Sequence, residues 1–321
     1  MNAVKSTVTL SAEQIKSYQT NGFIVVEDLF SPEEVEVLRE AEGSPAIQSA
    51  LEEGGIKHQT VHLLELTTRH RAFLDLARDP RIVGRIQPLI GEDIQLQHSK
   101  LATKPAARGM GAFGWHQDIM YYPHTNTSLL SVFVYLDDAT IENGCMSMVA
   151  GSHQLGPLSH LDDRGVFVGA CRESSLWENN PGKVIPIQPR AGSISIHHCL
   201  TLHGSPVNQS GKPRRGVVFS YRADDSYQFG DTIFQDTGLV VSGKRKGIVR
   251  CEAMSWLLPL RGTKGVKDYG NAYHQTGEWA ERLNAGAPPK SIPAVAPVAR
   301  ESATNEKREA ETMPIGSGAR N

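Results

Sequence analysis

A histidine and an aspartate stand one residue apart, at His116 and Asp118, within the aromatic segment GAFGWHQDIMYYP (residues 111–123). In an extended chain, residues i and i+2 project to the same face, so an imidazole and a carboxylate at this spacing can bind one metal ion together. A polar turn with a surface ion pair would show the same spacing. The pair therefore indicates half of a metal site only if a third ligand comes from elsewhere in the chain.

The best candidate for the third ligand is His203, in LTLHGSPVNQSGKPRRGVVFSY (residues 200–221). It ends an apolar run and precedes a Gly-Ser-Pro turn, where a side chain can reach into the mouth of a barrel. Two histidines and one carboxylate on a single face form the facial triad of non-haem Fe(II) oxygenases. Such a triad leaves positions open for a bidentate 2-oxo acid and for dioxygen. A separation above about 7 Å between the His203 ring and the Asp118 carboxylate would exclude a shared ion.

Arg214 strengthens this interpretation, because it begins the strand-like run RRGVVFSY shortly after His203. A guanidinium can bind a carboxylate through two parallel hydrogen bonds. A dicarboxylic co-substrate with one end on iron needs such an anchor for its other end. The alternative is that Arg214 and Arg215 are both exposed loop residues. If one of them faces the interior, Arg215 is expected to point the other way.

The other histidines need no role in a metal site, since most of the twelve stand in helical or turn-like sequence. His197 and His198 are adjacent in a strand-like run, and adjacent strand residues point to opposite faces. At most one of these two can therefore face the interior.

The composition is that of an ordinary globular protein, with 39% hydrophobic and 21% charged residues in a chain of 321. A net charge of −2 gives no general attraction for nucleic acid or an anionic membrane. No apolar run approaches the roughly 20 residues that span a bilayer, and the N-terminal sequence lacks the apolar core of a signal peptide. The four cysteines form no C-x-x-C pair. We therefore expect a cytoplasmic protein with reduced thiols.

Helices are predicted in the first third of the chain. Ser11 with Gln14 forms a capping-box pattern for a helix that ends near Gly22. A strand is predicted over residues 23–30, and a second helix begins at Ser31-Pro32. Helical spacing recurs over residues 70–91.

From about residue 93 the pattern changes to short strand-like runs separated by Gly, Pro and Asn turns. The runs are IQLQHSKLATK, LLSVFVYLDD, CMSMVAGSH, KVIPIQPRAGSISIHH and RRGVVFSYRAD. They predict an antiparallel sandwich or barrel. We expect one domain over residues 1–284 and a flexible tail over residues 285–321, which hold five prolines and no aromatic residue.

Three segments in this order carry a family resemblance: WHQD followed by Tyr, then DDATIENGCMSMVAGSH, then HGSPVNQSGKPRRGVVFSY. They resemble the phytanoyl-CoA dioxygenase family of Fe(II)/2-oxoglutarate-dependent oxygenases, over roughly residues 12–260. The resemblance implies a mostly β fold, a double-stranded β-helix (jelly roll) flanked by N-terminal helices. It implies a metal centre of His116, Asp118 and His203, with Arg214 binding the distal carboxylate of 2-oxoglutarate.

Further site residues follow from the resemblance by position. Ser205, His98, Ser131 and Phe133 fall where the family contacts the co-substrate. The residues that we expect to line the substrate pocket are Trp115, Gln117, Tyr121, Tyr122 and Arg222, although packing or rim exposure explains them equally well. Family relatives that chlorinate their substrates replace the carboxylate ligand with a small residue. Because this chain keeps Asp118, the resemblance implies oxygen chemistry instead.

The predicted reaction is oxidation of a substrate C–H bond, with hydroxylation the usual outcome, coupled to decarboxylation of 2-oxoglutarate to succinate. Desaturation, epimerisation and ring closure stay open, as do the identity of the small or medium substrate and the oligomeric state. Two other functions fit the triad. A non-catalytic jelly-roll module would hold a closed four-ligand zinc ion, and a metal-dependent hydrolase would use the same residues to activate water.

Overall fold

The computed structural model describes residues 9–53, 61–229 and 232–257, so the predicted tail over residues 285–321 lies outside the described part of the chain. The α-helices are α1 (Ala12–Asn21), α2 (Pro32–Glu42), α3 (Pro45–Glu53), α4 (Leu66–Arg69), α5 (Arg71–Ala77), α6 (Pro80–Ile90) and α7 (Ser175–Glu178). Three 3₁₀ turns are η1 (Asp118–Met120), η2 (Ser152–Leu155) and η3 (Pro181–Lys183). No helix within these ranges has the length and hydropathy that a membrane-crossing helix requires.

Two antiparallel sheets form the core. The larger has the order β1-β8-β5-β10-β3-β11, with β2 also paired to β3, and the smaller has the order β4-β9-β6-β7. The strands are β1 (Phe23–Val26), β2 (Val61–Leu64), β3 (Ile94–Lys104), β4 (Phe113–His116), β5 (Leu129–Tyr135), β6 (Ser147–Val149), β7 (Val184–Pro186), β8 (Ile194–His198), β9 (His203–Ser205), β10 (Arg214–Ala223) and β11 (Leu239–Ser242). The predicted jelly roll with N-terminal helices is confirmed.

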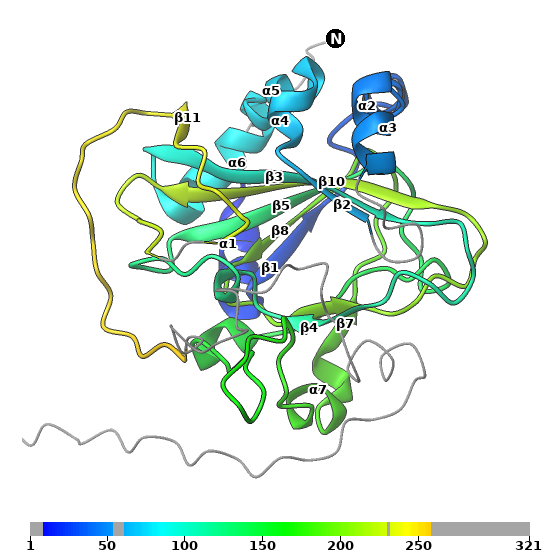
Figure 1. Cartoon of the computed structure of the whole chain (residues 1–321). Helices are drawn as coiled ribbons and strands as arrows, with labels where there is room; N and C mark the ends of the chain where they lie inside the picture. Colours follow the sequence, from blue (N-terminus) through cyan, green and yellow to red (C-terminus); the bar gives the residue numbers. More distant parts are fainter. Residues whose placement is uncertain (1–8, 54–60, 230–231, 258–321) are drawn as a thin grey trace, which may run out of the picture. The chain divides into compact units, whose positions relative to one another are not determined.

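The larger sheet separates the main hydrophobic core from a layer that mixes polar and apolar side chains. On β10, Val217 and Phe219 belong to the main hydrophobic core together with residues of the N-terminal helices. The alternate residues Arg214 and Val218 face the opposite way and line a pocket. Figure 1 shows the two sides: α2 to α5 lie on one side of the larger sheet, and β4, β7 and α7 on the other. The face that carries the pocket therefore lies between the two sheets, where a jelly roll holds its ligands.

The N-terminal helices begin where the sequence predicts. Ser11 caps α1 in a capping box with Gln14, and Gly22 ends the helix with a left-handed φ of 86°. Ser31 forms the same box with Glu34 at the start of α2. The strand predicted over residues 23–30 is shorter, because β1 ends at Val26 and Asp28 takes a positive φ of 52° in the following turn. The turn allows the chain to enter α2.

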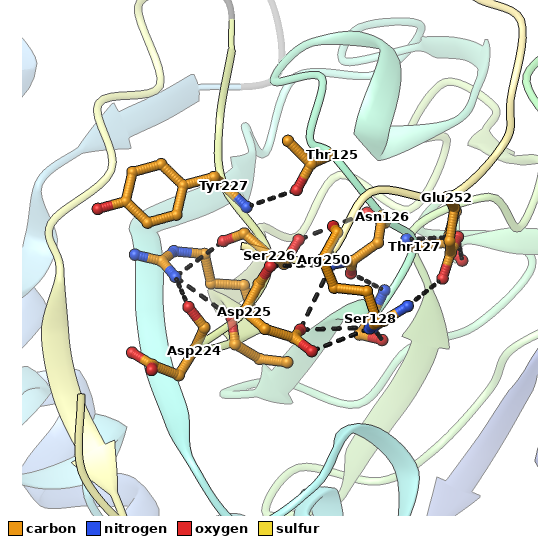
Figure 2. Close-up of polar contacts among 12 residues, drawn as sticks. Thr125, Asn126, Thr127, Ser128, Asp224, Asp225, Ser226, Tyr227, Arg250 and Glu252 are labelled. Atoms are coloured by element: carbon orange, nitrogen blue, oxygen red, sulfur yellow. Dashed lines mark hydrogen bonds and ion pairs between the residues drawn. The ribbon is translucent and has the colours of Figure 1, made fainter. Parts of the chain in front are cut away.

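The last described segment, residues 246–257, is fastened to the sheet ends by polar side chains (Figure 2). Arg250 bonds Asp225 at 2.9 Å and Glu252 at 2.6 Å. Buried Asn126 donates to the carbonyl oxygens of Arg250 and Asp225, at 3.0 and 3.1 Å. These contacts join the segment to the start of β5 and the end of β10.

Candidate metal centre and co-substrate pocket

Two strands of the smaller sheet bring the predicted metal ligands together. His116 ends β4 and pairs in register with His203 at the start of β9, while Asp118 begins the η1 turn two residues later. The Asp118 Oδ1 atom lies 3.6 Å from His116 Nε2 and 3.7 Å from His203 Nε2. All three potential ligand atoms lie within 4.8 Å of one another. Two ligands at right angles around an ion with bonds near 2.1 Å would be about 3.0 Å apart, so this arrangement fits a single ion.

Backbone hydrogen bonds fix the proton on each imidazole. The Nδ1–H of His116 donates to the Gly114 carbonyl oxygen at 2.8 Å, and that of His203 donates to Thr201 at 2.9 Å. A carbonyl oxygen only accepts, so in each neutral ring the proton is on Nδ1 and Nε2 carries a free lone pair. Burial lowers the pKa of His203 well below its ordinary value, which keeps that ring neutral. Both Nε2 atoms are therefore ready to bind a cation.

The second oxygen of Asp118 is held by two donors. Ser131 Oγ donates to Oδ2 at 2.6 Å, and His197 Nε2 donates to the same atom at 3.1 Å. Burial acts to raise the pKa of the Asp118 carboxyl, but its polar neighbours, with the hydrogen bond from His197 among them, hold this pKa well below its usual range. The carboxylate is thus ionised and oriented with Oδ1 toward the imidazoles.

His197, to which no role could be assigned from the sequence, lies beside the candidate metal ligands. It is buried and lines the pocket, and its ring centre lies 4.5 Å from that of His203, whereas His198 lies near Tyr18 and His153. The alternation in SISIHH held a usable signal, because the isoleucines of β8 face the helices. His197 must then share the opposite, polar face with the serines.

The pocket extends from these three candidate ligands to Arg214 and holds about 490 Å³ of empty space, part of which is open solvent at its mouth. Arg214 is only 3% exposed and lies over the Phe133 ring, with 5.7 Å between the guanidinium carbon and the ring centre. It donates to the Gly144 carbonyl oxygen at 2.8 Å, and its Nε has no hydrogen-bond partner among the described residues. No described carboxylate pairs with it, and burial lowers its pKa. A buried guanidinium without a counter-charge fits the carboxylate of a bound ligand.

The exposed-loop alternative for Arg214 is wrong, and Arg215 is the arginine that points away from the pocket. Arg215 bonds Asp137 through two nitrogens, at 2.9 and 2.8 Å. A close approach shapes the floor beside Arg214, since a Cβ on Gly216 would lie 1.9 Å from the Phe133 ring. Only glycine fits there.

The other residues expected at the co-substrate lie in two places. Phe133 and Ser205 line the same pocket as the three candidate ligands and Arg214. His98 and Ser131 are not among its lining residues; they lie on one cross-strand row of the larger sheet, each in register with Ser220. The His98 ring packs 5.0 Å from that of Tyr122, and its Nε2 has no hydrogen-bond partner in the described part of the chain.

The residues expected to contact the substrate do not line this pocket. Trp115 points away from His116 and stacks on Trp177 at 5.3 Å. The Gln117 side chain bonds the backbone of Gly156, Leu158 and Leu200.

The remaining three are also engaged elsewhere. Tyr121 donates its hydroxyl to Gly169, and the Tyr122 hydroxyl bonds Ser220 at 3.3 Å. Arg222 pairs with Asp236 at 2.8 Å and bonds Gln95 at 2.6 Å. These contacts give each of the five side chains a structural position.

Comparison with known proteins agrees with this geometry. The family model described as phytanoyl-CoA dioxygenase (PhyH) matches residues 18–216, more than half of the chain. The chain belongs to the phytanoyl-CoA dioxygenase family. A probable alpha-ketoglutarate-dependent hypophosphite dioxygenase of Stutzerimonas stutzeri is 31% identical over 255 residues, which are 73% of this chain and 86% of that protein. An ectoine dioxygenase of Bordetella bronchiseptica is 28% identical, over 67% of this chain and 76% of the relative.

Solved structures share the fold. The carbocyclase SnoK from nogalamycin biosynthesis superposes with a TM-score of 0.59 at 24% identity. The match covers 68% of this chain and 86% of the SnoK chain. EctD from S. alaskensis, solved with 2-oxoglutarate and 5-hydroxyectoine, superposes with a TM-score of 0.58 at 22% identity, covering 74% and 87%. The family assignment and the converging triad make this chain an Fe(II)/2-oxoglutarate-dependent dioxygenase, with dioxygen as its oxidant.

Proposed function

We propose that His116, Asp118 and His203 hold Fe(II), that Arg214 and Ser205 bind the distal carboxylate of 2-oxoglutarate, and that the enzyme hydroxylates a small organic molecule. One observation carries the proposal. The Nε2 atoms of two imidazoles and one carboxylate oxygen converge in a pocket that also holds a buried guanidinium without an ion-pair partner among the described residues. The bound iron supplies the redox chemistry that couples decarboxylation of the co-substrate to oxidation of the substrate by dioxygen.

The surrounding residues prepare the pocket for that chemistry. Ser131 and His197 hold one oxygen of Asp118 and leave the other for the metal. Phe133 and Val218 form an apolar wall between the metal ligands and Arg214. This wall excludes water beside the co-substrate and strengthens the charge pairing at Arg214.

The alternatives from the sequence are less well supported. A closed zinc site needs a fourth ligand, and within the described residues the group whose ligand atoms converge has three members; the Nε2 of the nearby His197 is instead bonded to Asp118 Oδ2. Neither a zinc module nor a hydrolase gives Arg214 a ligand to bind. The names of the relatives, a hypophosphite dioxygenase and ectoine dioxygenases, support a small-molecule substrate. We also propose a cytoplasmic location, which the four unpaired cysteines support.

The test is a visible charge-transfer band. Purified without oxygen and given Fe(II) and 2-oxoglutarate, the wild-type protein should develop the weak band of the metal–co-substrate complex. Asp118→Ala and His203→Ala should abolish it, because each removes one of three metal ligands. His198→Ala is the matched control, since His198 points away from the site, and it should keep the band. If both ligand variants keep the band with wild-type affinity, the metal assignment is wrong.

A further inference from the structure

Lys100 is a second buried cation in the pocket, and the proposed function does not use it. It stands on β3 in register with Val218 of β10 and is only 8% exposed. It lines the same pocket as the metal ligands and Arg214. Burial lowers the pKa of its ammonium group, and the charge of Asp118 acts in the opposite direction. The amine therefore lies within electrostatic reach of the metal centre.

The Lys100 ammonium has no ion-pair or hydrogen-bond partner within the described part of the chain. Among these residues, no carboxylate forms an ion pair with it and no acceptor receives a hydrogen bond from it; its Nζ lies 5.5 Å from the centre of the Phe234 ring. Lys104, four residues along the same strand, is different, because it donates to the carbonyl oxygens of Gly111 and Pro206. An unpaired ammonium is costly to bury, and an anionic ligand would remove that cost.

Charge balance indicates that Lys100 binds a group other than the co-substrate. Among the described residues that line the pocket, Asp118 is the one with an acidic side chain. The formal charges of Fe(II) (+2), Asp118 (−1), 2-oxoglutarate (−2) and Arg214 (+1) sum to zero. Protonated Lys100 brings the loaded pocket to +1, so one further negative group would restore neutrality. Lys100 also lies about 13 Å along β3 from Lys104, the partner of Arg214 in register, at roughly 3.3 Å per residue. Lys100 and Arg214, the two cations in question, thus project from different positions along the sheet.

We propose that Lys100 binds an anionic group of the primary substrate, so that the enzyme acts on small molecules that carry a carboxylate or a phosphorus oxyanion. This inference rests on the proposed function, because it assumes that 2-oxoglutarate occupies Arg214 and the metal. The anion of the substrate is then anchored on β3, in the pocket that the proposed metal ligands line. An uncharged analogue of the same shape lacks this contact and binds more weakly.

The experiment measures binding near the metal without turnover. The protein is loaded with 2-oxoglutarate and Mn(II), a redox-inert substitute for iron, and the paramagnetic relaxation of probe protons is followed by NMR. The probes are matched pairs: butyrate with butyramide, and methylphosphonate with its dimethyl ester. In the wild type, at least one anion should bind at least tenfold more tightly than its neutral partner. Lys100→Met, which keeps the apolar stem, should abolish the preference; Lys100→Arg should retain it.

Controls distinguish the possible failures. Lys183→Met, at an exposed lysine outside the pocket, should behave as wild type. The inference is overturned if the wild type shows no preference for either anion, a result that needs no variant to fold. It is also overturned if Lys100→Met weakens 2-oxoglutarate tenfold and leaves the anion preference intact, because Lys100 then serves the co-substrate. A wild-type protein that forms no metal–co-substrate complex would refute the proposed function itself.

Discussion

Replacement of Ser131 by alanine tests whether the orientation of Asp118 determines metal affinity. The Ser131 hydroxyl donates to Asp118 Oδ2 at 2.6 Å inside the protein, where water cannot replace it. A hydrogen bond to a charged group contributes about 1.5–3 kcal/mol, and about 1.4 kcal/mol corresponds to a tenfold change in an equilibrium constant. His197 still holds the same oxygen. We therefore expect Ser131→Ala to weaken metal binding about 10- to 100-fold.

The assay is titration with Mn(II), in which the electron paramagnetic resonance signal of the free ion gives the dissociation constant directly. Ser195→Ala is the matched control, because Ser195 is also a fully buried serine of the larger sheet and bonds the Tyr135 hydroxyl at 3.0 Å. Its metal affinity should stay within threefold of wild type. If folded Ser131→Ala protein also binds Mn(II) within threefold of wild type, the Ser131 hydroxyl does not contribute to metal binding through Asp118.

Three other changes give separate tests. Arg214→Lys should raise the dissociation constant of 2-oxoglutarate at least 30-fold, corresponding to about 2 kcal/mol for losing a buried forked contact, while Arg215→Lys should leave it unchanged in the same titration. Asn126→Ala should lower the free energy of unfolding by about 1–3 kcal/mol in denaturant melts, because it removes the buried amide that donates to the Arg250 and Asp225 carbonyl oxygens. The exposed Asn180→Ala should change it by less than 0.5 kcal/mol, about the usual surface effect. Burial lowers the pKa of His160 in the folded protein to about 3. Between pH 6.5 and 3 the unfolded chain therefore binds a proton at His160 that the folded protein does not. The contribution of His160 to stability is complete above about pH 6.5 and is lost on acidification. Between pH 6 and 4 the free energy of unfolding of His160→Phe should fall less steeply than that of the wild type, by up to about 1.4 kcal/mol per pH unit. Equal slopes of the free energy of unfolding against pH for the wild type and the variant would refute this.

The sequence predicted features that depend on neighbouring residues. The caps at Ser11 and Ser31 are confirmed because a capping box involves four adjacent residues. The strand segments and the jelly roll are confirmed for a similar reason, since turns and alternation are local signals. The spacing of His116 and Asp118 likewise predicted that the imidazole and the carboxylate lie near each other, and they do.

Features that depend on pairing between distant strands were not predictable in this way. Lys100 and Lys104 point to the same face of one strand. Of the two, Lys104 alone donates to carbonyl oxygens, which belong to residues 111 and 206. Arg222 appeared suitable for the pocket, but Gln95 and Asp236 engage its guanidinium on the far side of a β-bulge between Ser220 and Tyr221. No local pattern contains those partners.

A second irregularity determines which side chain faces the proposed metal site. On β4, Phe113 pairs with Ser205 and His116 with His203, so three residues of β4 advance against two of β9. Regular pairing from Phe113 would place Trp115 opposite His203 and turn His116 to the other face. With the bulge, Phe113 and His116 both line the pocket, and Trp115 stacks on Trp177 outside it. The metal centre thus depends on one extra residue in a short strand, because the register of β4, as well as the H-x-D spacing, brings the His116 imidazole to the site.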